Sequence, residues 1–163
     1  MTLNQAFLSE VRKEYTVNGM ESPINGFSLY GLSSNKKEAG HTFLVLCEDH
    51  DCGHRVEEIL NGIDLLEKGQ KNGNSYLCIM SAEKPTVDLC TYFNGKSFVH
   101  LILLDNCFNK LVYDKKFYYY DSKSIKRLMD TYQKCFTSLG KGVLSRFMRK
   151  FICRLRLNEV SRQ

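Results

Sequence analysis

Apolar residues recur at helical spacing in three parts of the chain, with polar residues between them. Such stripes are typical of amphipathic helices that pack one face on a core. The predicted helices cover residues 2–16, 56–66 and 122–136. The last of them begins at Asp121 or Ser122, residue types that cap helix N-termini.

Runs of apolar or alternating residues predict six short strands. They cover residues 27–32, 42–47, 76–80, 86–93, 98–104 and 111–113. Asn94-Gly95 lies between the fourth and fifth strands and favours a two-residue hairpin turn, so we expect these strands to begin a C-terminal antiparallel meander. Asn18-Gly19 and Pro23 instead predict a loop after the first helix.

Helices alternate with strands only in part of this order. The pattern therefore predicts an α/β or α+β domain, with a single mixed sheet of about five or six strands flanked by helices. The chain has 163 residues, of which 43% are hydrophobic and 25% charged, the proportions of one ordinary globular domain. Disordered, collagen-like and coiled-coil proteins are excluded by this composition. We expect the domain to cover residues 1–140 and a separate tail to cover 141–163.

The cysteines and the N-terminus indicate a cytoplasmic protein. Seven cysteines cannot all pair within one chain, and a reducing compartment would leave Cys47, Cys78 and Cys90 as small buried thiols. The first 13 residues lack the apolar run of a signal peptide. The longest apolar run, 98–104, contains His100 and is far shorter than a membrane span of about 20 residues. We expect His100 to be buried and hydrogen-bonded in a central strand.

Positive charge is concentrated at the C-terminal end. Residues 141–163 carry seven basic residues and one acidic residue, whereas the preceding 140 residues have a net charge of −1. Apolar residues recur at helical spacing between the basic ones, which predicts a basic amphipathic helix. The candidate membrane- or anion-binding residues are Arg146, Phe147, Arg149, Lys150, Phe151, Arg154 and Arg156. This helix could lie in a membrane interface, dock on its own domain or bind nucleic acid.

A dense polar cluster follows the second predicted strand. It contains two thiols and two imidazoles, the ligand types that zinc prefers, at Cys47, His50, Cys52 and His54. The spacing matches no established zinc motif, and no second pair of ligands follows it. The favoured alternative is a solvated loop, with Cys47 buried at the strand end and Asp51 near the start of the next helix.

No complete catalytic motif occurs in the sequence. The chain lacks a nucleophile elbow, a Walker loop and a dinucleotide-binding glycine turn. Glu83-Lys84 follows a predicted strand, but its spacing differs by one residue from the metal-binding edge of nucleases. A binding domain is therefore favoured over an enzyme.

The sequence runs NSYLCIMS at 74–81, FVHLILLD at 98–105 and NKLVYD at 109–114, with an aromatic-led helix after them. This pattern resembles the soluble domain that precedes the membrane spans of some bacterial rhomboid-family proteins, over residues 42–135. The resemblance implies a cytoplasmic accessory domain whose basic tail leads toward a span. It implies no protease activity, because the rhomboid catalytic serine and histidine belong to membrane helices.

These observations together predict a non-catalytic cytoplasmic binding domain. We expect it to lie next to an anionic membrane surface, or against a partner protein, through the basic helix that begins at residue 141. The alternative is a nucleic-acid-binding or metal-dependent nuclease-like protein, with the tail on phosphates and zinc in the 47–54 cluster.

Overall fold

The computed structural model describes residues 1–34, 41–68, 73–83, 87–96, 98–107, 109–113 and 123–139. The strands are β1 (Thr16–Met20), β2 (Phe27–Ser33), β3 (Thr42–Cys47), β4 (Ser75–Ala82), β5 (Val99–Asp105) and β6 (Lys110–Tyr113). The helices are α1 (Leu3–Val11), α2 (Val56–Lys68), α3 (Val87–Asn94) and α4 (Lys123–Leu139), with a 3₁₀ turn η1 (Gly53–Arg55) before α2.

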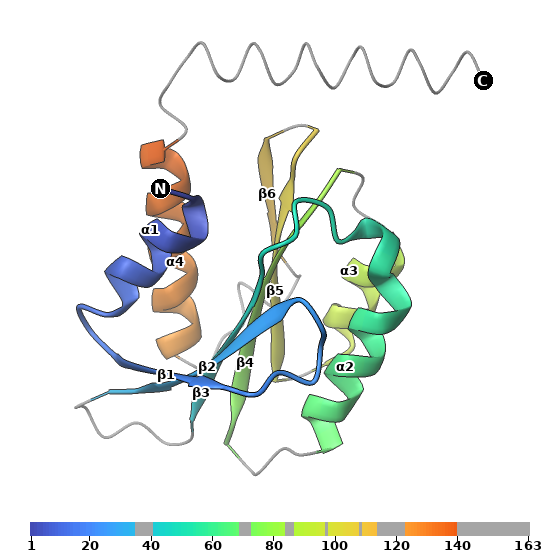
Figure 1. Cartoon of the computed structure of the whole chain (residues 1–163), viewed down its shortest axis with the longest axis horizontal. Coiled ribbons are helices and arrows are strands. Elements are labelled where there is room, and N and C mark those ends of the chain that lie inside the picture. The colour runs from blue at the N-terminus through green and yellow to red at the C-terminus, as the bar shows by residue number, and fades with distance from the viewer. Residues whose placement is uncertain are drawn as a thin grey trace.

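The six strands form one mixed sheet in sequence order, from β1 at one edge to β6 at the other. Strands β1, β2 and β3 are antiparallel, β3, β4 and β5 are parallel, and β6 returns antiparallel to β5. Helices α1 and α4 cover one face of the sheet, and α2 and α3 cover the other (Figure 1). The predicted single mixed sheet flanked by helices is confirmed.

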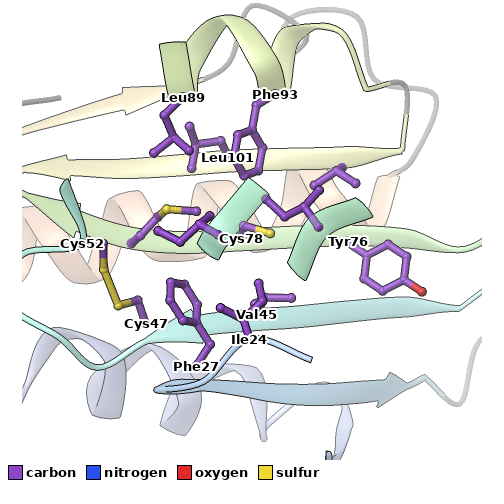
Figure 2. Packing of buried hydrophobic residues seen from close by; sticks show 14 of the residues in the cluster. Ile24, Phe27, Val45, Cys47, Cys52, Tyr76, Cys78, Leu89, Phe93 and Leu101 are labelled. Carbon is purple, nitrogen blue, oxygen red and sulfur yellow. A yellow bond between two sulfur atoms is a disulfide. The ribbon is translucent and has the colours of Figure 1, made fainter. Parts of the chain in front are cut away.

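Alternation along each strand divides the core into two clusters. Val45 of β3 and its neighbours on the same face pack against α2 and α3, as Figure 2 shows. Leu44 and Leu46 point to the opposite face and pack against α1 and α4. Because both faces are covered, β4 and β5 are apolar along most of their length, as is typical of buried parallel strands. His100 is buried in β5, with an exposed fraction of 4%.

Helices α1 and α4 pack together on their side of the sheet. A capping box fixes the start of α1, in which Thr2 and Gln5 exchange side chain–backbone hydrogen bonds. Phe7 of α1 meets Tyr132 of α4 edge to face, with ring centroids 5.1 Å apart. Helix α1 is shorter than predicted, but Tyr15 still lies buried in the same cluster.

The predicted hairpin across Asn94-Gly95 is wrong. Residues 87–94 form helix α3, with Leu89 and Phe93 buried one helical turn apart. The physical reason is the direction of pairing. Because β4 and β5 are parallel, the chain must cross over between them, and a helix is the usual crossover. Among the described residues, the predicted meander is reduced to the antiparallel pair β5–β6.

The loop predicted after the first helix is also wrong in part. Thr16–Met20 forms β1, an edge strand paired with β2, and only Val17 in it is even half-buried. Because this edge strand is exposed on both faces, its sequence has no alternation of apolar and polar residues from which a strand could be predicted. The predicted tail 141–163 lies outside the described residues. Within the described segments, no helix is both long and apolar enough to cross a membrane.

Candidate functional site

The carboxyl ends of the three parallel strands meet at one edge of the sheet. The loop after β3 carries the predicted 47–54 cluster, and Glu83 and Asn106 begin the loops after β4 and β5. Ligands of open α/β sheets bind at such an edge where the strand order reverses. Here α2 and α3 cross on the same face, so the order runs from β3 to β5 without a reversal.

A disulfide closes the loop after β3. It joins Cys47, the last residue of β3, to Cys52, five residues further on, and both side chains are buried in the core (Figure 2). The expectation that Cys47 is a thiol is therefore wrong. The two sulfurs bind each other, and neither is the thiolate that zinc requires. A zinc site in this loop would first need reduction of the disulfide, and it stays a prediction.

The two histidines of the cluster point to different surroundings. Asn106, just after β5, donates a hydrogen bond from its amide to the His50 carbonyl at 2.5 Å and lies 3.1 Å from His50 Nδ1. His54 is exposed in η1. In the part of the chain that the structure describes, no group of three or more His, Cys, Asp or Glu side chains is arranged to hold a metal ion.

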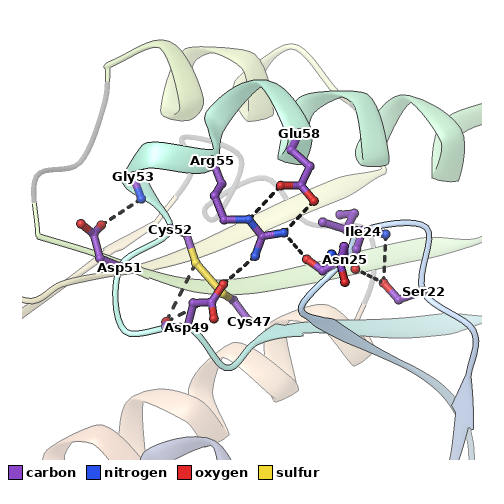
Figure 3. Close-up of polar contacts among 10 residues, drawn as sticks. All are labelled: Ser22, Ile24, Asn25, Cys47, Asp49, Asp51, Cys52, Gly53, Arg55 and Glu58. Atoms are coloured by element: carbon purple, nitrogen blue, oxygen red, sulfur yellow. Dashed lines mark hydrogen bonds and ion pairs between the residues drawn. A yellow bond between two sulfur atoms is a disulfide. The ribbon is translucent and has the colours of Figure 1, made fainter.

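Asp51 ties the loop to the next strand. Its Oδ1 accepts the Gly53 N–H at 2.9 Å (Figure 3). The same oxygen accepts the Glu83 N–H at 3.2 Å. The Cys52 N–H also donates to the Ser81 carbonyl, at 2.7 Å. Asp51 therefore lies at the start of η1, as the solvated-loop alternative expects, and its carboxylate serves to hold the loop.

Arg55 fastens the same loop from the other side. Its guanidinium lies 2.5 Å from Asp49 Oδ2 and 2.8 Å from Glu58 Oε1, and it also donates to the Asn25 carbonyl (Figure 3). It lies over the Phe27 ring, 5.6 Å from the centroid. The hydrogen bond from Arg55 lowers the pKa of Glu58. All these contacts join protein groups to one another, so Arg55 is engaged in holding three segments together.

A second polar cluster joins α2 to α3. Lys96, just after α3, lies 3.3 Å from Asp64 and also contacts Glu67, both on α2. The Tyr92 hydroxyl donates to Asp64. This hydrogen bond, followed by the one from Lys96, lowers the pKa of Asp64. The cluster fixes the two crossover helices side by side.

The two helical faces of the molecule carry opposite charge. Helix α2 has four carboxylates and one lysine, a net charge of −3. Helix α4 has four basic residues and one aspartate, a net charge of +3. Lys123, Lys126 and Lys134 of α4 are exposed and make no ion pair with any described residue. The acidic and basic helices lie on opposite sides of the sheet (Figure 1).

Of the four predicted metal ligands, Cys47 and Cys52 thus form a disulfide, whereas His50 contacts Asn106 and His54 is exposed. The seven predicted membrane-binding residues between 146 and 156 lie outside the described residues. The sequence predicted no role for Arg55, one of whose partners, the Asn25 carbonyl, lies 30 residues away along the chain. It also predicted no role for the basic surface of α4, although four basic residues in 123–134 were a visible signal.

No family model matches the chain, and neither a curated protein nor a solved structure is similar enough to it to count as a match.

Proposed function

We propose that this chain is a non-catalytic binding domain that lies against an anionic membrane surface. The tail from residue 141 is its main attachment, and the exposed side of α4 is a second contact. The observation that carries the proposal is the charge separation across the sheet. Helix α4, with a net charge of +3, precedes the tail, with +6, whereas α2 together with Arg55 and Lys96, which pair with three of its four carboxylates, has a net charge of −1.

This separation favours one orientation of the domain. Each lysine or arginine near an anionic lipid surface contributes about 1 kcal/mol of binding. The lysines of α4 would be attracted, whereas the α2 side, where three of the four carboxylates are in ion pairs, has no excess of positive charge to compete with them. The attraction falls with salt because the Debye length is only about 10 Å at 0.1 M.

The polar groups at the carboxyl ends of the parallel strands support a binding role over a catalytic one. Asp51, Arg55 and Asn106 are each engaged in contacts that hold loops in place. Loops that are fixed in this way give the domain a rigid surface, and a rigid surface loses little conformational entropy when it binds a partner. The resemblance to rhomboid-family soluble domains agrees with a juxtamembrane position and stays a prediction.

The test is cosedimentation of the full chain with vesicles of phosphatidylserine and phosphatidylcholine, or of phosphatidylcholine alone. We expect binding to the anionic vesicles only, weakened by salt and abolished by Phe147→Ser with Phe151→Ser. Lys123→Gln and Lys126→Gln should each weaken binding about fivefold, which corresponds to about 1 kcal/mol. Lys68→Gln removes the same charge from α2 and is the matched control.

Two results would contradict the proposal. Equal binding to neutral vesicles would remove the role of charge. Loss of an oligonucleotide complex through the lysine variants, with the phenylalanine variants still binding both ligands, would support the nucleic-acid alternative, because phosphate contacts need no inserted apolar residue.

A further inference from the structure

A hollow of about 310 Å³ opens between α1 and α4. It is lined by the end of α1, by the turn from Lys13 to Tyr15, and by one side of α4 from Arg127 to Ser138. This volume lies at the small end of the range for ligand sites, about 300–1,000 Å³. The hollow lies on the face of the sheet that α1 and α4 cover, whereas the disulfide Cys47–Cys52 lies on the face that α2 and α3 cover. The two share no residue.

Two of the cations that line the hollow have no partner among the described residues. Lys13 is paired with Glu10 at 2.6 Å. Arg127 and Lys134 make no side-chain hydrogen bond or ion pair with any residue in the described segments, and Glu14 is the remaining carboxylate. Arg127 is half-buried, and a partly desolvated guanidinium without a counter-ion is unfavourable. A bound anion would relieve that cost.

Tyr15 supplies a second, independent observation. The side chain is 7% exposed, and its hydroxyl has no hydrogen-bond partner among the described residues. Buried hydroxyl groups without a partner are rare and call for an explanation. A ligand oxygen in the hollow that Tyr15 lines would be a partner for this hydroxyl.

The remaining lining residues indicate that the ligand has an apolar or organic part beside its anionic group. Val11, Leu128 and Cys135 give the hollow an apolar part, so an inorganic ion alone would leave it unfilled. The Thr131 hydroxyl donates to the Arg127 carbonyl at 2.9 Å and is already engaged. A guanidinium matches two oxygens of a phosphate at once, and Lys134 adds a point charge.

We propose that the hollow between α1 and α4 binds a small organic phosphate through Arg127, Lys134 and Tyr15. The phosphate could belong to a phospholipid headgroup or to a free phosphomonoester. The hollow reaches Ser138, close to the start of the basic tail, which places it beside the proposed membrane contact. The headgroup form of the inference rests on the proposed function, and the free form does not.

The first experiment titrates the full chain with sn-glycerol 3-phosphate, with glycerol and matched salt as controls, and measures binding by calorimetry. We expect binding of the phosphate ester only. Arg127→Gln with Lys134→Gln should weaken it at least tenfold. Lys68→Gln with Lys110→Gln removes the same charge from exposed positions outside the hollow and should leave the affinity within twofold.

Tyr15→Phe separates a ligand contact from a structural role. Removing a hydroxyl that has no partner among the described residues should leave the midpoint of urea unfolding unchanged or raised in the absence of ligand. The affinity for glycerol 3-phosphate should fall about twofold to tenfold, the range that one net hydrogen bond supplies. A variant that lost stability and kept its affinity would contradict the role given to Tyr15.

Vesicles distinguish the two sources of the phosphate. If glycerol 3-phosphate displaces the chain from phosphatidic acid vesicles, the ligand is a headgroup. If glycerol 3-phosphate binds without displacing the chain from the vesicles, or if the chain binds no vesicles at all, the ligand is a free phosphate and the inference stands without the proposed function. The inference is overturned if glycerol 3-phosphate does not bind, or if both double variants lose it equally.

Discussion

Gly62 offers a sharp test of the packing between α2 and the β1–β2 loop. Gly62 lies buried within α2 and faces Ile24, which is 1% exposed. A Cβ built on Gly62 would lie 2.0 Å from Ile24 Cγ1 and 2.9 Å from Cδ1, where real Cβ atoms do not come closer than about 3.0 Å. The Ile24 side chain therefore occupies the space that any other residue at position 62 would need.

Two effects of Gly62→Ala oppose each other. Helix propensity alone predicts that alanine stabilises a helix interior by about 1 kcal/mol relative to glycine. Steric overlap must either displace Ile24, whose burial contributes about 1.5–3 kcal/mol, or shift α2 on the sheet. We expect the overlap to prevail, with a net loss of about 2 kcal/mol of unfolding free energy. For a chain of this size, that corresponds to a fall in Tm of about 4–8 °C.

The assay is urea unfolding of the full chain followed by circular dichroism, in a double-mutant cycle. Ile24→Ala alone should destabilise the protein by about 2–4 kcal/mol, because it leaves a cavity. In that background Gly62→Ala should raise the stability, since the new methyl group enters the vacated space. The change of sign isolates the contact. If Gly62→Ala stabilised the protein with Ile24 present, the close packing of these two residues would be refuted.

Three further predictions concern the disulfide, the α2–α3 cluster and the core. Reduction by dithiothreitol should lower the unfolding free energy by about 2 kcal/mol, the loop-closure contribution of so short a ring, and Cys47→Ala with Cys52→Ala should abolish that sensitivity. The lowered pKa of Asp64 stabilises the fold above the unfolded pKa of about 4, and this stabilisation should be lost as the pH falls through the folded pKa. Asp64→Asn should therefore flatten the acid limb of a stability–pH curve, and an unchanged limb would contradict the assignment. Burial raises the pKa of Cys135, so iodoacetamide at pH 7.5 should label it at least tenfold more slowly than in urea, as followed by peptide mass spectrometry.

Local periodicity was sufficient for most of the fold. The apolar stripes predicted α1, α2 and α4, and the runs at 42–47, 76–80 and 98–104 are β3, β4 and β5. These helices and strands bury apolar side chains against one another, and burial of one side of an element requires apolar residues at regular spacing along the sequence. The burial of His100 followed for the same reason, because its strand is apolar on both sides.

Periodicity failed where two conformations share one pattern or where burial is absent. Leu89 and Phe93 fit a strand or a helix equally well, and the parallel pairing of β4 with β5 decided for the helix. Thr16–Met20 has no buried face, so only its hydrogen bonds to β2 make it a strand. In both cases the deciding factor is pairing with another strand of the sheet.

The candidate site shows the same division. The sequence by itself placed two cysteines, two histidines and three carboxylates in one loop, and it concentrated positive charge after residue 140. The tertiary structure decided that Cys47 binds Cys52, and it brought Lys134 of α4 and Tyr15, which follows α1, into the lining of one hollow. Composition and charge are properties of a chain in any conformation. Which groups remain without a partner depends on contacts between distant segments, and these exist only once the sheet and its helices have packed.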